Sequence, residues 1–364
     1  MEALRAMLES LGLLGLLTGE GGYAPILTEE EKASVFDGEP PSVEAIARRL
    51  SANEFEHVVV VVGAGLSVSA GVPDFRSPSG LYAALAESGQ DLPEPEAVFD
   101  IEFFRANPTP FFALARALMP PDSDSAGEEE EGGPSPTRAH YFLKLLETMG
   151  VLQRVYSQNI DGLELSAGLD PELLIQVHGS FHTATCTLCG KTFEDEAMGR
   201  VKETIMEGSI PVCTAEDCLG VVKPDIVFFG ESLPEVFFEM SPHDMEAADL
   251  VIVMGTSLTV APVSSLPSRV PPTIPRLLIN REVVGDFQTG QDNYRDVCAL
   301  GDLDDVVGEL VALVGEPWES EFADLVANVR DRVCESDVRS VAQSLAATVA
   351  AVSSDPSPSP NDNH

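Results

Sequence analysis

The chain has 364 residues, and its 60 acidic against 21 basic residues leave a formal net charge of −39 at pH 7. A field of this sign repels phosphate backbones, which argues against direct nucleic-acid binding, and it attracts basic partner proteins. No apolar run approaches the roughly 20 residues of a membrane-spanning helix. The first residues also lack the features of a signal or transit peptide. We therefore expect a protein of the cytoplasm, the nucleus or both, without a membrane span.

The apolar pattern along the chain predicts strands that alternate with helices. Residues 1–17 carry leucines at helical spacing, and Ser42 is typical of an N-cap for a helix that reaches Leu50. The five consecutive valines 58–62 predict a strand buried on both faces. Further strands are expected at 151–156, 250–254, 277–279 and 297–300, and helices at 111–118 and 139–149. This alternation predicts an α/β fold, a Rossmann-like doubly wound parallel sheet.

Composition divides the chain further. We expect an N-terminal extension in residues 1–45 and a Rossmann-like catalytic domain in 46–179 and 223–315, interrupted by a small inserted module in 180–222. Residues 120–137 are rich in acidic residues, Pro, Gly and Ser, which predicts a disordered acidic loop. Residues 316–364 form a C-terminal extension, and its tail repeats Ser and Pro.

A glycine turn follows the first predicted strand. Gly63, Ala64 and Gly65 form half of a dinucleotide-binding fingerprint, in which glycines let the backbone approach a pyrophosphate at the N-terminus of the next helix. The third glycine of that fingerprint is missing. Asp74, Phe75 and Arg76 then place two charges and a ring beside the expected cofactor. The alternative is that Phe75 is core and Arg76 forms a surface ion pair.

Two cysteine pairs lie within the small module. Cys186 and Cys189 are separated by two residues, and Cys213 and Cys218 by four. Four thiolates are a complete tetrahedral shell for Zn²⁺, so we expect a structural zinc site rather than a catalytic one. A disulfide or redox pair is the alternative. Two further cysteines, at 298 and 334, are single and expected to be packed.

Five blocks occur in the order that is characteristic of the sirtuins, the NAD-dependent protein-lysine deacylases, and this chain resembles them over roughly residues 50–310. The first block runs from Gly63 to Ser77. The others are 157–163, His178-Gly179, 222–231, and Gly255-Thr256-Ser257 followed by Asn280.

The resemblance implies a reaction that consumes NAD. In it the acyl-lysine oxygen attacks the nicotinamide ribose, nicotinamide leaves, and a ribose hydroxyl that is deprotonated with the help of His178 attacks the resulting alkylimidate. The products are free lysine and O-acyl-ADP-ribose. His178 follows the apolar stretch Leu173–Val177, which predicts a further strand, and its ordinary pKa near 6.5 suits a base at neutral pH.

The resemblance also implies roles for other residues. His178, Asn159 and Asp161 are expected to be catalytic, and Phe75 to keep water from the anomeric carbon. The expected NAD-binding residues are Ala64, Gly65, Leu66, Ser67, Val68, Asp74, Phe75, Arg76, Gln158, Asn159, Ile160, Asp161, Thr256, Ser257, Asn280, Arg281, Glu282 and Leu303. The expected substrate-binding residues, in a segment that pairs with the peptide, are Val227, Phe228, Gly230 and Glu231. Asp161 could equally be near the cap of a helix.

The substrate is expected to be an acylated lysine in a basic protein, such as a histone or a cytoskeletal protein. The resemblance implies that sirtuins which prefer dicarboxyl groups carry a tyrosine and an arginine in the helix predicted at 111–118. Residues 111–118 contain Phe111, Phe112 and Leu114 and lack a tyrosine beside Arg116, which favours acetyl or longer fatty acyl groups over dicarboxyl groups. The alternatives are a protein mono-ADP-ribosyltransferase and a catalytically quiet NAD-binding scaffold. A dehydrogenase is the alternative at the level of the fold.

Overall fold

The computed structural model describes residues 27–88, 92–119, 134–327, 329 and 335–353. Its centre is a six-stranded parallel sheet in the order β3-β2-β1-β7-β8-β9. The strands are β1 (Val58–Val62), β2 (Leu152–Ser157), β3 (Leu174–Gln176), β7 (Leu250–Met254), β8 (Arg276–Asn280) and β9 (Asp296–Leu300). The strand order reverses at β1, which opens a crevice at the carboxyl ends of β1 and β7. The predicted Rossmann-like fold class is confirmed.

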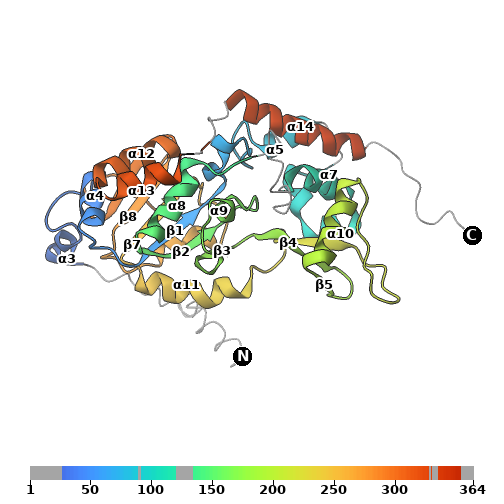
Figure 1. Ribbon diagram of the computed structural model, residues 1–364, viewed down its shortest axis with the longest axis horizontal. Helices are drawn as coiled ribbons and strands as arrows, with labels where there is room; N and C mark the ends of the chain where they lie inside the picture. The colour runs from blue at the N-terminus through green and yellow to red at the C-terminus, as the bar shows by residue number, and fades with distance from the viewer. Residues whose placement is uncertain (1–26, 89–91, 120–133, 328, 330–334, 354–364) are drawn as a thin grey trace, which may run out of the picture.

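Helices cover both faces of this sheet (Figure 1). One face packs against α4 (Val43–Ser51), α8 (Arg138–Thr148), α12 (Leu303–Val314) and α13 (Trp318–Leu325). The other packs against α11 (Glu235–Ala247) and the 3-10 helix η6 (Val263–Ser268). Alternate valines of β1 point to opposite faces, so that Val58, Val60 and Val62 join the first core and Val59 and Val61 the second. All five valines are fully buried, which explains why every residue of this strand is apolar.

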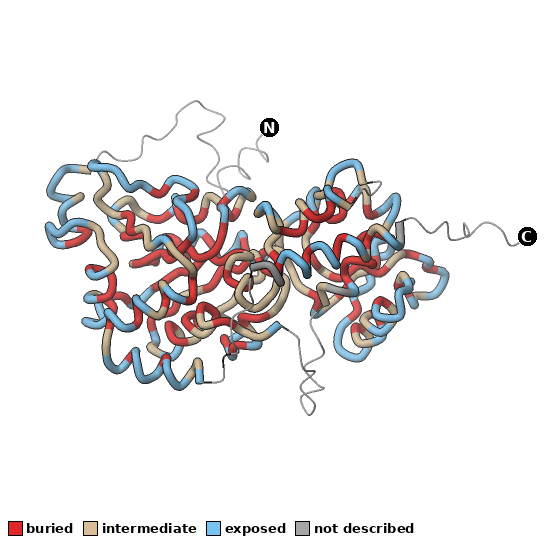
Figure 2. Tube along the Cα trace, turned by 90° about the horizontal axis from the view of Figure 1, so that it is seen from above, coloured by how far each residue is buried: buried red, intermediate tan, exposed pale blue. Residues whose placement is uncertain are grey.

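A second lobe is built around a three-stranded antiparallel sheet in the order β5-β4-β6. Its strands are β4 (Gly179–Cys186), β5 (Thr192–Phe193) and β6 (Val222–Ile226). The helices of this lobe are α5 (Leu81–Glu87), α6 (Ile101–Ala106), α7 (Thr109–Leu118), α10 (Asp195–Met206) and α14 (Glu335–Ser353). Residues 180–222 thus share one hydrophobic core with helices that come from distant parts of the chain. Figure 2 shows the buried residues in two interiors, one in each lobe.

The remaining described elements are short. They are α3 (Glu29–Ser34), α9 (Leu163–Ser166) and the 3-10 helices η1 (Ala64–Leu66), η2 (Val68–Ala70), η3 (Pro95–Phe99) and η5 (Pro171–Leu173). Within the described residues, no helix combines the length and the apolar character needed to cross a bilayer. The predicted segment 1–17, most of the acidic loop 120–137, the end of the tail and the cysteine at 334 lie outside the described residues.

The helix that we expected after the glycine turn does not form. The structure has two separate 3-10 turns there, η1 and η2, and Gly71 ends the second with a φ of 89°. That left-handed conformation favours glycine and stops a helix. Pro73 follows two residues later, which disfavours helical geometry at Val72. The chain therefore turns into an irregular loop at the cleft instead of running away from it.

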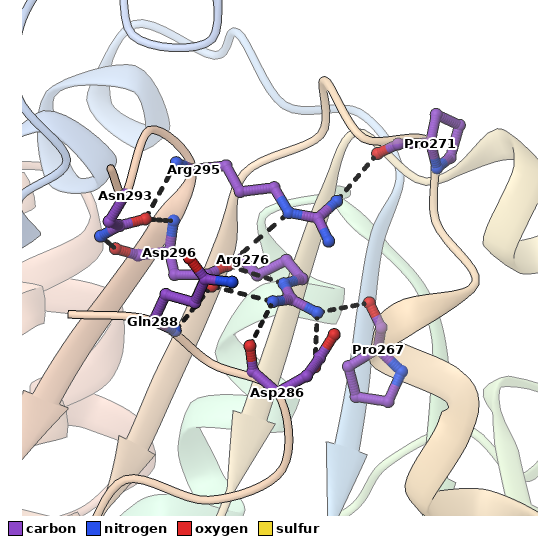
Figure 3. A network of polar contacts seen from close by, with 8 residues as sticks. All are labelled: Pro267, Pro271, Arg276, Asp286, Gln288, Asn293, Arg295 and Asp296. Atoms are coloured by element: carbon purple, nitrogen blue, oxygen red, sulfur yellow. Dashed lines mark hydrogen bonds and ion pairs between the residues drawn. The ribbon is translucent and has the colours of Figure 1, made fainter. Parts of the chain in front are cut away.

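A buried ion network holds the opposite, amino-terminal end of β8 (Figure 3). Arg276 donates to both carboxylate oxygens of Asp296, at 2.7 and 2.8 Å, and to Asp286 at 2.9 Å. The guanidinium also donates to the carbonyl of Pro267 at 3.1 Å. The two parallel hydrogen bonds to the Asp296 carboxylate require the planar, forked guanidinium group of an arginine. Because Asp286 and Asp296 lie in the segment that follows Asn280, the network anchors the far end of a loop that begins at the cleft.

Candidate active site

A cleft of about 710 Å³ lies at the carboxyl ends of the central strands, and both lobes contribute to it. Predicted cofactor residues that line it are Ala64, Gly65, Val68, Asp74, Phe75, Arg76, Gln158, Asn159, Ile160, Thr256, Ser257, Asn280, Arg281, Glu282 and Leu303. The predicted base and substrate residues that line it are His178, Val227, Phe228, Gly230 and Glu231. Three further predicted residues, Leu66, Ser67 and Asp161, are not in its lining. Most residues that the sequence singled out therefore meet in one place.

The loops after β1 and β7 touch each other and form the floor of the cleft. The Gly65 N–H donates to the carbonyl of Gly255 at 2.8 Å. A Cβ on Gly65 would lie 2.7 Å from the Gly255 Cα, and one on Gly63 would lie 2.7 Å from the Thr256 Cβ. The glycines of the turn are thus required for close backbone packing between the two loops. This packing brings Ala64 and Thr256 to the same wall.

The loop after η2 carries the aromatic and charged residues over the cleft. Asp74 accepts the N–H of Ser77 at 2.8 Å, and the Asp74 carbonyl accepts the N–H of Leu81, so the loop folds back onto the start of α5. The Phe75 ring lies 5.8 Å from the rings of both Tyr82 and Phe99. The side chain of Arg76 lies over the Tyr82 ring at 5.7 Å. Phe75 both lines the cleft and packs on the core of the second lobe. The hypothesis that Phe75 is a core residue and the hypothesis that it contacts the cofactor are therefore compatible.

Tyr82 and Phe99 are cleft residues that the sequence did not single out. Burial raises the pKa of Tyr82 to about 12, although the charge of Arg76 opposes this, so its phenol stays neutral. The helix 111–118 was expected to border the acyl group. Phe111 instead lies behind Phe228, with 4.8 Å between the ring centroids, and does not line the cleft. The wall is nevertheless apolar, because Phe75, Phe99 and Phe228 form it.

The ribose side of the cleft follows β2. The Gln158 side-chain amide donates to the Val62 carbonyl at 3.1 Å and to Thr256 Oγ1 at 2.9 Å, which ties β2 to β1 and β7. Asn159 is buried, and its Nδ2 lies 3.5 Å from Ser67 Oγ. Asp161 accepts from Ser67 Oγ at 2.7 Å and from the N–H of Leu163 at 3.0 Å. Asp161 therefore lies next to the N-cap of α9, which is Gly162, and its carboxylate supports the cleft wall from behind.

His178 lies where the chain crosses from β3 to β4, between the two lobes. Its Nδ1 is 2.9 Å from the Gln158 carbonyl oxygen. Because a carbonyl can only accept, Nδ1 carries the hydrogen and Nε2 keeps a free lone pair. Burial lowers the pKa of His178 from its ordinary 6.5, and the bond to Gln158 partly opposes this. The ring is thus neutral at pH 7, in the tautomer that a base requires.

The chain crosses back from the second lobe along the predicted substrate segment. The Val227 N–H donates to the His178 carbonyl at 2.8 Å, and the Phe229 N–H to the Phe99 carbonyl at 2.8 Å. Lys223 is buried and holds the segment from below. Its Nζ donates to the carbonyl of Ile226 at 2.7 Å and lies 3.1 Å from Glu231 Oε2. Burial lowers the pKa of Lys223, and Glu231 opposes this.

The four predicted zinc ligands come together at the far end of the second lobe. The sulfurs of Cys186, Cys189, Cys213 and Cys218 all lie within 4.8 Å of one another, with two pairs at 3.7 Å. A tetrahedral Zn²⁺ with Zn–S bonds of about 2.3 Å places its sulfurs about 3.8 Å apart. The cysteines that the structure describes are free thiols, which argues against the disulfide alternative. Backbone N–H groups of Leu188 and Ala215 point at two of the sulfurs, at 3.4 Å each, as thiolates would require.

The chain is similar to known enzymes over most of its length. The Sir2 family profile matches residues 63–262. NAD-dependent protein deacetylase sirtuin-2 of Danio rerio is 43% identical over 315 residues, which cover 82% of this chain and 78% of that protein. NAD-dependent protein deacetylase sirtuin-3 of Mus musculus is 43% identical over 318 residues, covering 87% and 86%. NAD-dependent protein deacetylase hst2-1 of Emericella nidulans is 47% identical over 300 residues, covering 80% and 76%. The chain therefore belongs to the Sir2 family, the sirtuins.

Proposed function

We propose that this chain is an NAD-dependent protein deacetylase that removes acyl groups from lysine side chains. The observation that carries the proposal is the neutral His178, whose free Nε2 faces a cleft that joins a dinucleotide wall to an apolar wall. Its sirtuin relatives bear the name of that activity. The products expected are nicotinamide, free lysine and O-acyl-ADP-ribose.

NAD fits the wall formed by the loops after β1, β7 and β8. The glycines at 63 and 65 allow the turn after β1 to pack on the loop after β7, and this turn lines the cleft where a pyrophosphate would bind, together with Asn280 at the end of β8. Bound NAD would supply an electrophilic ribose carbon that loses nicotinamide and accepts the acyl oxygen. The side chains of Gln158 and Asn159 offer amides for the ribose hydroxyls.

His178 would take the proton of a ribose hydroxyl at Nε2, while the Gln158 carbonyl steadies Nδ1–H. Phe75 would keep water away from the reacting carbon, because its ring closes over the cleft against Tyr82 and Phe99. Asp161 acts through Ser67 rather than by direct contact, since both its oxygens are already occupied on the far side of the wall.

The acyl-lysine would enter along residues 227–231. Added-strand pairing with this segment uses main-chain bonds and leaves the surrounding peptide sequence little constrained. The rings of Phe99 and Phe228 offer no partner for a terminal carboxylate, which favours acetyl and longer fatty acyl groups. The charge of −39 favours basic proteins, such as histones or cytoskeletal proteins, as substrates.

Zinc would bind at the four cysteines and stabilise the second lobe. Four thiolates leave no open coordination position, so the metal takes no part in the reaction. Removal of zinc should therefore lower activity by destabilising the second lobe.

The test is a panel of acylated lysine peptides incubated with NAD and analysed by mass spectrometry. We expect O-acyl-ADP-ribose from acetyl and fatty acyl peptides, and none from the His178→Tyr variant. His182→Tyr is a matched control, because His182 is exposed in β4 and does not line the cleft. ADP-ribose attached to protein without deacylated peptide would show a mono-ADP-ribosyltransferase, and NAD binding without turnover would show a quiet scaffold.

A further inference from the structure

A buried carboxyl pair lies behind the ribose wall of the cleft. Glu164 belongs to α9, three residues after Asp161, and has no exposed surface. It does not line the cleft and was not among the site residues expected from the sequence. A fully buried carboxyl beside a second carboxyl is costly, since burial and like charge both oppose its ionisation. The cost of burying this carboxyl group suggests that Glu164 has a role in the site.

Hydrogen bonds connect Glu164 to the ribose-binding amide. Ser157 Oγ donates to Glu164 Oε1 at 2.5 Å and accepts the backbone N–H of Asn159 at 3.0 Å. Glu164 thus fixes Ser157, and Ser157 fixes the backbone from which the Asn159 side chain projects toward the cleft. Through these hydrogen bonds Glu164 positions a residue of the cleft without contacting a ligand itself.

A second branch returns from Asn159 to Asp161 through Ser67. The N–H of Thr137 donates to His140 Nδ1 at 3.1 Å, so His140 carries its hydrogen on Nε2, which lies 3.5 Å from Ser67 Oγ. The Nδ2 of Asn159 also donates to Ser67 Oγ. Because Ser67 Oγ accepts from both, its own hydrogen goes to Asp161, at 2.7 Å. Asp161 is therefore the acceptor in this pair. Burial raises the pKa of Asp161, and the hydrogen bonds from Ser67 and from the N–H of Leu163 oppose this and favour its ionised form.

Glu164 is left as the protonated member. Asp161 receives two donors, whereas Glu164 receives one, and its Oε2 is buried without a hydrogen-bond partner. Burial, together with the charge of Asp161, raises the pKa of Glu164 to about 7, although the hydrogen bond from Ser157 opposes this. His140 is no counter-ion, because burial lowers its pKa to about 3.

We propose that Glu164 is a positioning residue of the NAD site, which as a neutral carboxylic acid holds Asn159 through Ser157, while Asp161 is the charged member of the carboxyl pair. The proposal rests on the proposed function, because it assigns the wall to the ribose of NAD. A second negative charge on Glu164 would repel Asp161 and disturb α9, which begins at Leu163. Ionisation of Glu164 should therefore loosen the site.

The test compares Glu164→Gln, which keeps an Oε1 acceptor and cannot ionise, with Glu164→Leu, which removes the acceptor. Glu172→Gln is the control, because Glu172 is an exposed carboxylate of η5 that does not line the cleft. KM for NAD, kcat and nicotinamide exchange are measured from pH 6 to pH 9 with one acetyl-lysine peptide. We expect Glu164→Gln to stay within about threefold of wild type at pH 6 and to lack the alkaline decline of the wild-type kcat/KM for NAD. Glu164→Leu should lose about tenfold or more in kcat/KM for NAD, with the KM for the peptide unchanged.

Equal activity of Glu164→Leu and wild type, or equal loss in both variants with the wild-type pH profile, would overturn the proposal. Infrared difference spectra of wild type minus Glu164→Gln at pH 6 give a measurement that needs no turnover and survives failure of the leucine variant to fold. A protonated-carboxyl band that fades as the pH rises is expected, and its absence at pH 6 refutes a neutral Glu164. If wild type shows no deacylation at all, the proposed function fails, while the band and NAD affinity by calorimetry still decide the role of Glu164.

Discussion

Gly179, directly after the base His178, has a matched partner elsewhere in the chain for testing how closely β4 and β6 of the second lobe pack together. Gly179 has a φ of +72°, and a Cβ there would lie 1.9 Å from the Asp225 carbonyl oxygen. Gly150 has a φ of +73°, with nothing within 4 Å of an added Cβ. Substitution by alanine therefore imposes the same backbone strain at both sites, about 1–2 kcal/mol. Only Gly179→Ala adds a collision with the neighbouring strand.

The collision must push β4 away from β6. That separation breaks the Gly179–Ile226 pairing and the bond from the Val227 N–H to the His178 carbonyl. Roughly two or three hydrogen bonds at about 1 kcal/mol each add about 2–3 kcal/mol to the strain. We expect Gly179→Ala to lower the free energy of unfolding by about 3–5 kcal/mol and Gly150→Ala by about 1–2 kcal/mol.

The assay is urea unfolding followed by circular dichroism, together with kcat/KM for an acetyl-lysine peptide. Gly179→Ala should lose activity at temperatures where it remains folded, because both His178 and Val227 shift. Gly150→Ala should keep it. If the two variants lose equal stability and both keep full activity, the close contact between β4 and β6 does not exist as described.

Four further outcomes follow from the site. Lys223→Met should weaken folding by about 2–3 kcal/mol and raise the KM for the peptide but not for NAD, since two backbone carbonyls lose their donor; an unchanged peptide KM would contradict this. Zinc chelation should lower the melting temperature and activity together, and a fully active metal-free protein would refute a structural site. The acid limb of kcat/KM should lie below pH 6.5, because burial lowers the pKa of His178 from that value; a limb well above it would exclude His178 as the base. Raising the pKa of Glu164 from 4.5 to about 7 costs folding about 3 kcal/mol above pH 7 and nothing below pH 4.5. Glu164→Gln should therefore gain in unfolding free energy relative to wild type between those pH values, and a constant difference would argue against the raised pKa.

Local sequence was sufficient to predict the central strands and the cluster of four cysteines. The run Val58–Val62 is a strand because both its faces are buried, and that condition is visible in the residues themselves. The spacing of the four cysteines likewise predicts a metal-binding cluster without any information on distant contacts. The positions of Gly63, Gln158 and His178 at strand ends were also predictable, since parallel strands bring their carboxyl ends to one edge.

Features that depend on contacts between distant segments were not predictable. The helix expected after Gly65 is replaced by two 3-10 turns, because the loop packs on Gly255. Asp161 meets Ser67 across 94 residues of sequence, so its carboxylate supports the wall from behind, which the motif alone does not reveal. The helix α14 packs on α5 and α7 and completes the core of the second lobe.

The most direct test of the central claim is the fate of NAD when the protein meets an acetyl-lysine peptide. Mass spectrometry should show nicotinamide, deacetylated peptide and O-acetyl-ADP-ribose in equal amounts with wild type and with His182→Tyr, and none of the latter two with His178→Tyr. Deacetylated peptide from His178→Tyr at the wild-type rate, or NAD left intact by the wild-type protein, would contradict the assignment of His178 and of the cleft.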